Sequence, residues 1–218
     1  MARVRKIERN PTANLKNCYV VDACFLANKY IPQAYAPNAV ERSRIQTCKR
    51  WWKEIEEQLS DKKATVYIPD VCIAETFKTL AKKYYDEKDK WFDKWTDYDR
   101  ARKRLIKDVQ IPSKDLKSSN RHVKYHDVPT CRDLIISVDR FYELFLTKNK
   151  HVGIIDLIVV ATAKYLIDFY GIPKKLVHIV TLDGPLWSGT KKIVELPNAY
   201  DPTKPGDSSS RIFRSRLR

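Results

Sequence analysis

Apolar residues along the chain follow two alternating patterns, one typical of buried strands and one typical of amphipathic helices. Short continuous apolar runs predict buried strands, and these lie at 18–21, 65–68 and 177–181. Apolar positions three or four residues apart predict helices, and these cover 38–59, 71–84, 131–146 and 154–170. Strands that alternate with helices in this way form a parallel sheet, so the pattern predicts an α/β fold.

Turn and capping residues support the predicted element boundaries. Asp70 follows Pro69 at the end of a strand, and it is a suitable N-cap for the helix over 71–84. Gly171 and Pro173 follow the helix over 154–170. A glycine can adopt the left-handed conformation that ends a helix, and proline lacks the N–H that would continue it.

The chain is predicted to contain one domain with a polar segment at each end. Residues 1–17 form a basic N-terminal lead, and residues 18–196 form the domain. A segment at about 85–125, rich in aromatic and charged residues, is predicted to be a helical insertion. The last residues, 197–218, carry Pro, Gly, Ser and Arg and predict a basic, flexible tail.

The charge of the chain indicates a polyanionic partner. Lys and Arg number 42 against 27 Asp and Glu, which gives a formal net charge of +15. RNA or DNA is the partner that this excess favours, although a basic protein with no such partner is the simple alternative. The cations considered for RNA contact are those of the predicted insertion: Arg100, Arg102, Lys103, Arg104 and Lys107.

The cysteine content and the apolar runs indicate a cytoplasmic protein with no membrane contact. Five cysteines without a Cys-x-x-Cys pair argue against a disulfide framework or a zinc site. The N-terminus lacks the apolar region of a signal peptide. The longest apolar run, 157–163, is far shorter than the roughly 20 residues that span a bilayer.

Four acidic residues occupy positions that could converge on one site. Asp22 and Asp183 follow predicted strands, Glu75 lies in a helix, and Asp156 lies in the first turn of another. The carboxyl ends of parallel strands are where α/β proteins bind ligands. Carboxylate clusters suit Mg²⁺ or Mn²⁺, which can promote phosphodiester hydrolysis. Each acid alone has an ordinary alternative as a turn, cap or surface residue.

The order of the acidic segments adds information that no single acid carries. The segments are Cys18-Tyr19-Val20-Val21-Asp22, Ile68-Pro69-Asp70-Val71-Cys72-Ile73-Ala74-Glu75, Asp156-Leu157-Ile158-Val159-Val160-Ala161-Thr162-Ala163 and Thr181-Leu182-Asp183. This succession resembles the PIN-domain nucleases, and in particular their VapC-type ribonuclease branch. The resemblance covers about 18–84 and about 130–187.

The resemblance implies a fold, an activity and a set of site residues. The implied fold is a three-layer α/β/α domain around a parallel sheet. The implied activity is endonucleolytic cleavage of RNA with Mg²⁺ or Mn²⁺ as cofactor. The matching positions, which would be both metal-binding and catalytic, are Asp22, Glu75, Asp156 and Asp183, with the Thr181 hydroxyl in support.

The chain also departs from the pattern of these nucleases. Many relatives have Ser or Thr just after the first Asp, where this chain has Ala23-Cys24, so a hydroxyl is replaced by a weak thiol donor. The insertion and the basic tail exceed the minimal toxin pattern. The alternatives are an inactive PIN-like module that binds nucleic acid or a protein partner, and a nuclease acting on DNA. An antitoxin partner and a homodimer are further hypotheses.

Three smaller predictions concern aromatic and histidine side chains. Trp51 and Trp52 are adjacent in a predicted helix, so one ring is expected in the core and the other exposed or at an interface. Trp91, Trp95 and Tyr98 are spaced for one helical face, which favours packing on the core over stacking with RNA bases. The histidines at 122 and 126 are expected at the surface.

Overall fold

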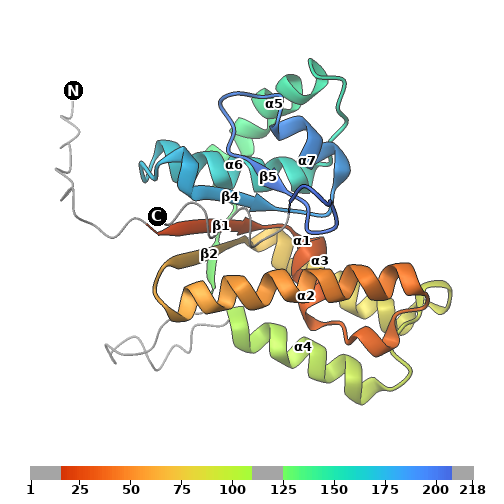
Figure 1. The fold of residues 1–218 in the computed structure, drawn as a ribbon. Helices are drawn as coiled ribbons and strands as arrows, with labels where there is room; N and C mark the ends of the chain where they lie inside the picture. Colours follow the sequence, from red (N-terminus) through yellow and green to blue (C-terminus); the bar gives the residue numbers. More distant parts are fainter. Residues whose placement is uncertain (1–15, 110–124, 208–218) are drawn as a thin grey trace, which may run out of the picture.

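A five-stranded parallel sheet forms the centre of the molecule, with helices on both faces (Figure 1). The computed structural model describes residues 16–109 and 125–207. The strand order is β3-β2-β1-β4-β5, and every neighbouring pair is parallel. The strands are β1 (Asn17–Val21), β2 (Ala64–Pro69), β3 (His126–Val128), β4 (Val177–Val180) and β5 (Ala199–Tyr200).

The connections place different helices on the two faces of the sheet. The chain leaves β1 through α1 (Ala23–Tyr30) and α2 (Ala39–Ser60), and it leaves β2 through α3 (Asp70–Tyr85) and α4 (Trp95–Val109). It returns from β3 to β4 through α5 (Arg132–Leu146) and α6 (Ile154–Asp168), and α7 (Gly184–Thr190) precedes β5. From β1 to β3 the chain adds strands toward one edge of the sheet, and β4 and β5 are added toward the other edge. Because crossovers between parallel strands are right-handed, this reversal places the later helices on the opposite face. Figure 1 shows α5, α6 and α7 on one side, and α2 and α4 on the other.

The predicted strands and helices are confirmed, with ends that shift by at most two residues. Short 3-10 turns complete the described elements: Gln33–Tyr35, Glu87–Asp89 and Lys174–Leu176. Gly171 has a φ of 60°, as its predicted role in ending α6 requires. The predicted N-cap at Asp70 is wrong, because Asp70 is the first residue of α3 and Pro69 is the cap. Its carboxylate instead accepts hydrogen bonds from the Thr130 backbone N–H at 3.0 Å and from the Thr130 hydroxyl.

Both tryptophans of α2 are buried within the chain, so the prediction that one ring is exposed or at an interface is wrong. Trp51 and Trp52 are 3% and 2% exposed. The Trp52 ring stacks on Phe25 at 4.8 Å between centroids, and the Trp51 ring lies 6.5 Å from that of Tyr200. The C-terminal segment that contains Tyr200 covers a side of α2 that would otherwise face solvent.

The predicted tail boundary at residue 197 is also wrong for residues 197–207. Strand β5 pairs with β4 there, and Asp201 and Asp207 are buried. The Asp207 carboxylate accepts hydrogen bonds from Trp187 Nε1 at 2.5 Å and from the Asp201 backbone N–H at 3.0 Å. Residues 1–15 and 208–218, where the rest of the predicted lead and tail fall, lie outside the described part, as does 110–124 with His122.

The segment predicted as an insertion packs on the core through α4. Trp91 and Phe92 are buried, and the Tyr98 ring stacks on Tyr84 at 5.3 Å. Packing is therefore confirmed for Trp91 and Tyr98, whereas Trp95 is 52% exposed. His126, predicted at the surface, is exposed but belongs to β3.

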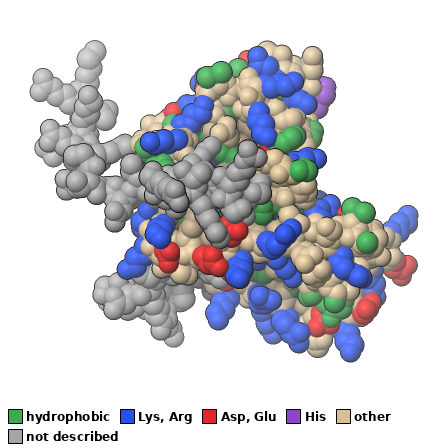
Figure 2. All heavy atoms as spheres, in the orientation of Figure 1, with side chains coloured by type: hydrophobic (Ala, Val, Ile, Leu, Met, Phe, Trp, Pro, Cys, Tyr) green, Lys and Arg blue, Asp and Glu red, His purple; other side chains and the backbone are tan. Residues whose placement is uncertain are grey.

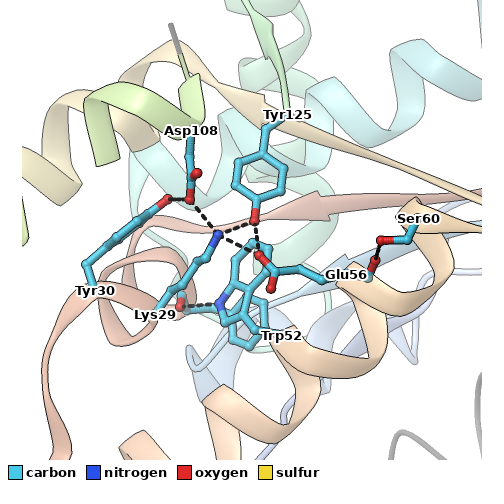
Figure 3. Close-up of polar contacts among 8 residues, drawn as sticks. Lys29, Tyr30, Trp52, Glu56, Ser60, Asp108 and Tyr125 are labelled. Carbon is cyan, nitrogen blue, oxygen red and sulfur yellow. Dashed lines mark hydrogen bonds and ion pairs between the residues drawn. The ribbon is translucent and has the colours of Figure 1, made fainter. Parts of the chain in front are cut away.

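A buried lysine joins the helices of this layer (Figure 3). Lys29 Nζ on α1 lies 2.6 Å from Asp108 Oδ2 on α4 and 2.9 Å from Glu56 Oε1 on α2. It also contacts the Tyr125 hydroxyl, just before β3, and lies 5.0 Å from the centre of the Trp52 ring. Burial lowers the pKa of Lys29, although the two carboxylates oppose that shift. One cation thus holds α1, α2, α4 and the start of β3 together.

In the residues that the structure describes, no helix is both long and apolar enough to cross a membrane.

Candidate metal centre and nucleic-acid cleft

Two of the predicted acids meet where the direction of the chain connections reverses. Asp22 follows β1 and Asp183 follows β4, and these strands are neighbours at the centre of the sheet. The connection from β1 leads to one face and the connection from β4 to the other. This arrangement opens a crevice at the carboxyl end of the two strands, which is the usual ligand site of open α/β sheets.

Asp22 is held rigidly by three hydrogen bonds. It is the N-cap of α1, and its Oδ1 accepts from the Phe25 backbone N–H at 2.6 Å. Its Oδ2 accepts from the Thr181 hydroxyl and from the Leu182 backbone N–H at 3.2 Å. The residue is only 2% exposed, and burial raises its pKa to about 6. The hydrogen bonds oppose this rise, and the negative charge of Asp183 adds to it.

Thr181 connects Asp22 to Asp183. Its hydroxyl oxygen accepts from the Asp183 backbone N–H at 2.9 Å while the hydroxyl proton is donated to Asp22. Asp183 is the N-cap of α7, where its Oδ1 accepts from the Leu186 backbone N–H at 2.6 Å. Within the described part of the chain, Asp183 Oδ2 accepts no hydrogen bond. Thr181, which was predicted to support the acidic residues, thus forms a hydrogen bond that links the end of β4 to Asp22 at the end of β1.

Asp156 and Glu75 face the same crevice from helices. Asp156 lies in the first turn of α6, and Glu75 lies on α3. Burial raises the pKa of Asp156 to about 7, and the charges of Asp183, Asp22 and Glu75 raise it further.

The four acids line one cleft of about 650 Å³. Its walls come from both helical layers, and its floor is the carboxyl edge of the sheet. The sequence predicted the acidic members, Asp22, Glu75, Asp156 and Asp183, and the structure brings all four together. The roles assigned to them in metal binding and catalysis stay predictions.

The carboxylate oxygens of the cleft are suitable ligands for a hard divalent cation, although the side chains do not lie close enough together to form a coordination sphere. Among the described residues, no group of three or more His, Cys, Asp or Glu side chains lies close enough together to hold a metal ion. Four oxygen-donating carboxylates that face one cleft nevertheless fit the preference of Mg²⁺ and Mn²⁺. For these two aspartates, the intramolecular hydrogen bonds leave Asp183 Oδ2 and one lone pair each on Asp22 Oδ1 and Asp183 Oδ1 for a cation.

The cleft extends beyond the acids into a region that the sequence did not reveal. Its outer part is lined by Asn28 on α1, Arg44 on α2, and Thr79, Lys82 and Lys83 on α3, together with Asp89 and Trp91. The Lys83 ammonium lies 3.7 Å from the centre of the Trp91 ring and 2.6 Å from Asp89 Oδ1. The signal for this region was the spacing Glu75, Thr79, Lys82, which places three polar residues on one helical face.

Cys24 is the residue whose thiol the sequence offers in place of a hydroxyl near Asp22, and it lines the cleft. Cys24 is exposed, but desolvation of its thiol by the surrounding protein raises the pKa to about 12, and the charges of Asp22, Glu75 and Asp156 contribute. The thiol therefore stays protonated near neutral pH and is a poor nucleophile. The hydroxyl that supports Asp22 comes from Thr181 instead.

The five cations predicted to bind RNA lie on α4 and do not line the cleft. Arg100 pairs with Asp97 at 3.3 Å, and Lys103 pairs with Asp99 at 2.6 Å. Arg102 also lies 3.7 Å from Asp99. All five residues are exposed to solvent, and the ion pairs cover only part of three of them. Figure 2 shows Lys and Arg side chains gathered over the layer that contains α2 and α4. RNA contact by these five residues stays a prediction.

Comparison with protein-family models and with curated proteins gave no match. Among solved structures, the chain is similar to FitAcB from Neisseria gonorrhoeae, with 14% identity and a TM-score of 0.49 over 84% of this chain and 97% of the other. A structure of FitAB bound to an IR36 DNA fragment gives the same identity, TM-score and share of this chain, and 94% of the other chain. VapBC2 from Rickettsia felis, bound to a DNA fragment from their promoter, gives 10% identity and a TM-score of 0.48 over 84% and 98%. Because these identities and TM-scores are low, the proposed function rests on the side chains of this chain alone.

Proposed function

We propose that the protein is a PIN-like endoribonuclease that depends on Mg²⁺ or Mn²⁺. The observation that carries the proposal is that four carboxylates from four separate elements line one cleft, on a chain of net charge +15. An acidic cleft on a basic protein fits a polyanionic substrate whose reacting phosphate needs a metal ion. The cations around the cleft would bind the other phosphates.

Each acid has a defined role in this proposal. Asp22 and Asp183 hold the cation from the sheet, while Asp156 and Glu75 complete the site from α6 and α3. Thr181 and Leu182 fix the orientation of Asp22 through their hydrogen bonds. A bound dication would activate water and offset the charge that develops on the phosphodiester during hydrolysis.

The four motifs also support a more specific hypothesis, that of a cytoplasmic VapC-type toxin. Such a protein would be inhibited by an antitoxin that blocks the acidic cleft. A neighbouring gene for a small protein with a basic DNA-binding region and an acidic or flexible tail would support this hypothesis. A solitary gene would favour RNA processing instead.

Substitution of two acids tests the proposed activity. Asp22→Asn and Asp156→Asn are each expected to reduce Mg²⁺-dependent cleavage of single-stranded RNA by at least about 100-fold, because each removes a charged metal ligand. Asp139→Asn is a matched control, since Asp139 is exposed on α5 outside the cleft. Folding is checked by circular dichroism. Undiminished cleavage by both folded variants would overturn the proposal.

The rival function is a PIN-like module that binds nucleic acid or a protein without cleaving. Cys24 in place of a hydroxyl residue favours this rival, as does the separation of the carboxylates in the structure. Titration with Mg²⁺ and Mn²⁺, followed by cleavage assays on RNA and DNA strands of the same sequence, distinguishes the functions. Cleavage of DNA alone would identify a deoxyribonuclease, and binding without cleavage of either strand would favour the module.

A further inference from the structure

Asn28 lines the cleft and carries a buried hydrogen-bond acceptor that has no partner among the described residues. The residue lies on α1, is 6% exposed and lines the cleft outside the acidic centre. Its Nδ2 donates to the Cys24 carbonyl oxygen at 2.8 Å. Its Oδ1 is buried and has no hydrogen-bond partner among the described residues. A buried acceptor without a partner destabilises the fold, so the contacts within the protein account for the amide nitrogen of Asn28 but not for its oxygen.

The low helix propensity of Asn is a second observation that favours a binding role for Asn28 over a role in stabilising α1. Asn has a lower helix propensity than Ala or Leu, and the neighbours of Asn28 on the cleft side of α1 are the small residues Cys24 and Ala27. An apolar residue at position 28 would avoid both the unpaired oxygen and the propensity penalty. The position is therefore better suited to binding something in the cleft than to stabilising α1.

The distance from the acidic centre identifies the part of a substrate that Asn28 could reach. Six residues separate Asp22 from Asn28, which corresponds to about 9 Å along α1. This distance places Asn28 outside the coordination sphere of an ion bound to Asp22, whose ligands lie at about 2.1 Å for Mg²⁺. A group bound at Asn28 belongs to a nucleotide beside the reacting phosphate.

The chemistry of the amide oxygen limits the kind of contact. Oδ1 can only accept a hydrogen bond, and phosphate oxygens near neutral pH also only accept, so they cannot pair with it. The donors of a nucleotide are the ribose 2′-hydroxyl and the N–H groups of its base. Across the cleft, Lys82 lies seven residues after Glu75 on α3, about 10 Å along the helix, and its side chain is 56% exposed. Lys82 can therefore hold a neighbouring phosphate.

We propose that Asn28 determines substrate specificity by accepting a hydrogen bond from the nucleotide next to the cleaved phosphate. The donor is the ribose 2′-hydroxyl or the exocyclic amino group of the base, and Lys82 binds the adjacent phosphate. This inference rests on the proposed function and adds the substrate contact that the four acids do not supply.

Equilibrium binding tests the inference without requiring cleavage. The full chain, in EDTA, is titrated onto fluorescent eight-nucleotide strands of four kinds: oligoadenylate and oligouridylate, each with ribose or deoxyribose. Asn28→Leu removes the acceptor at similar volume, whereas Asn28→Asp keeps an acceptor. Lys82→Ala is compared with Lys148→Ala, because Lys148 is exposed outside the cleft. Thermal unfolding confirms that each variant is folded.

A contact with the 2′-hydroxyl predicts that Asn28→Leu weakens binding of both ribose strands about tenfold and leaves the deoxyribose strands unchanged. A contact with the amino group predicts the same loss for both adenylate strands and none for uridylate. Asn28→Asp should retain the wild-type order of preference, with lower affinity for all strands because of its charge. Lys82→Ala should weaken all four strands more than Lys148→Ala does.

The remaining outcomes overturn the inference. No change with Asn28→Leu, or an equal loss on all four strands, would show that Asn28 makes no selective contact. If that result accompanies metal-dependent RNA cleavage by the wild type, the inference fails and the proposed function stands. If the selective loss is seen but the wild type cleaves nothing, the contact stands and the nuclease proposal fails.

Discussion

At the scale of single residues, the fold places several carboxylates of like charge along one cleft, where their charges repel one another. Asp22 is fixed by Thr181, Leu182 and Phe25, so it cannot move away when Asp156 and Asp183 are ionised. The raised pKa values of Asp22 and Asp156 express this repulsion together with burial. A cation that binds the carboxylates would remove the repulsion and should therefore stabilise the folded chain.

The raised pKa of Asp156 predicts how stability depends on pH in the absence of metal. The folded protein holds the Asp156 proton up to about pH 7, whereas an unfolded aspartate loses it near 3.8. The stability contributed by the neutral form is complete below 3.8 and is lost as the pH rises to about 7. Asp156→Asn keeps a neutral side chain, so at pH 8 it should stabilise the metal-free protein by about 1 to 3 kcal/mol.

Thermal unfolding in EDTA between pH 4 and pH 8 measures this effect. The melting temperature of the Asn variant should fall less than that of the wild type as the pH rises. Mg²⁺ added at pH 8 should raise the melting temperature of the wild type more than that of the variant. If the melting temperatures of both proteins fell equally as the pH rose, ionisation of Asp156 would not destabilise the folded protein.

At the scale of elements, the layer that contains α1 to α4 is joined by polar contacts buried between its helices. Lys29 contacts carboxylates on α2 and α4 as well as the segment before β3 (Figure 3). The same layer forms the outer wall of the cleft through Asn28, Lys82 and Trp91. The position of α4 therefore affects both stability and the shape of the proposed RNA site.

Loss of the Lys29 ammonium should destabilise this layer. Lys29→Met removes the cation that Glu56 and Asp108 share, and it should reduce the free energy of unfolding by about 2 to 4 kcal/mol. The estimate is below the value for fully buried pairs because the Glu56 side chain is 35% exposed. Urea unfolding measures the change. Lys53→Met, at an exposed position of α2, should alter stability by less than about 0.5 kcal/mol.

Packing of α7 against α5 depends on a glycine. A Cβ at Gly189 would lie 2.3 Å from Phe145 Cε1, and Phe145 is fully buried. Gly189→Ala should therefore displace that ring and destabilise the protein by about 1 to 3 kcal/mol. Gly184→Ala is the matched control in the same helix, because its Cβ would meet nothing within 4 Å. Equal melting temperatures for the two variants would contradict the observed packing.

At the scale of the whole molecule, the net charge of +15 should govern the affinity for RNA. Binding of single strands should weaken as salt increases, with a logarithmic slope of about −0.7 for each phosphate contacted. If Arg104 and Lys107 of α4 each bind a phosphate, the double change to Ala should reduce the slope by about 1.4. Titrations between 50 and 300 mM salt measure it.

Lys148→Ala together with Lys53→Ala is the charge-matched control for this measurement. Both lysines are exposed, and neither lines the cleft. The control pair should leave the slope close to that of the wild type. Equal slopes for the two double variants would show that α4 has no special part in RNA binding.

The sequence by itself determined the parallel α/β class and the candidate acids. Continuous apolar runs identified β1, β2 and β4 because a strand buried on both faces leaves a clear pattern. Helices α2, α3, α5 and α6 were recognisable from their amphipathic spacing. The short elements α1, α7, β3 and β5 were missed, because two to eight residues carry too little periodicity to separate a helix or strand from a loop.

Only the tertiary structure decided which residues share a site. It placed Asn28, Arg44 and Lys82 beside the acids, showed that residues 197–207 belong to the fold, and buried both Trp51 and Trp52. It also placed the α4 cations outside the acidic cleft, where the sequence could not locate them. The physical reason is the same in each case. Periodicity reports which face of an element is apolar, whereas the contacts between distant elements depend on how the whole sheet orders and connects its strands.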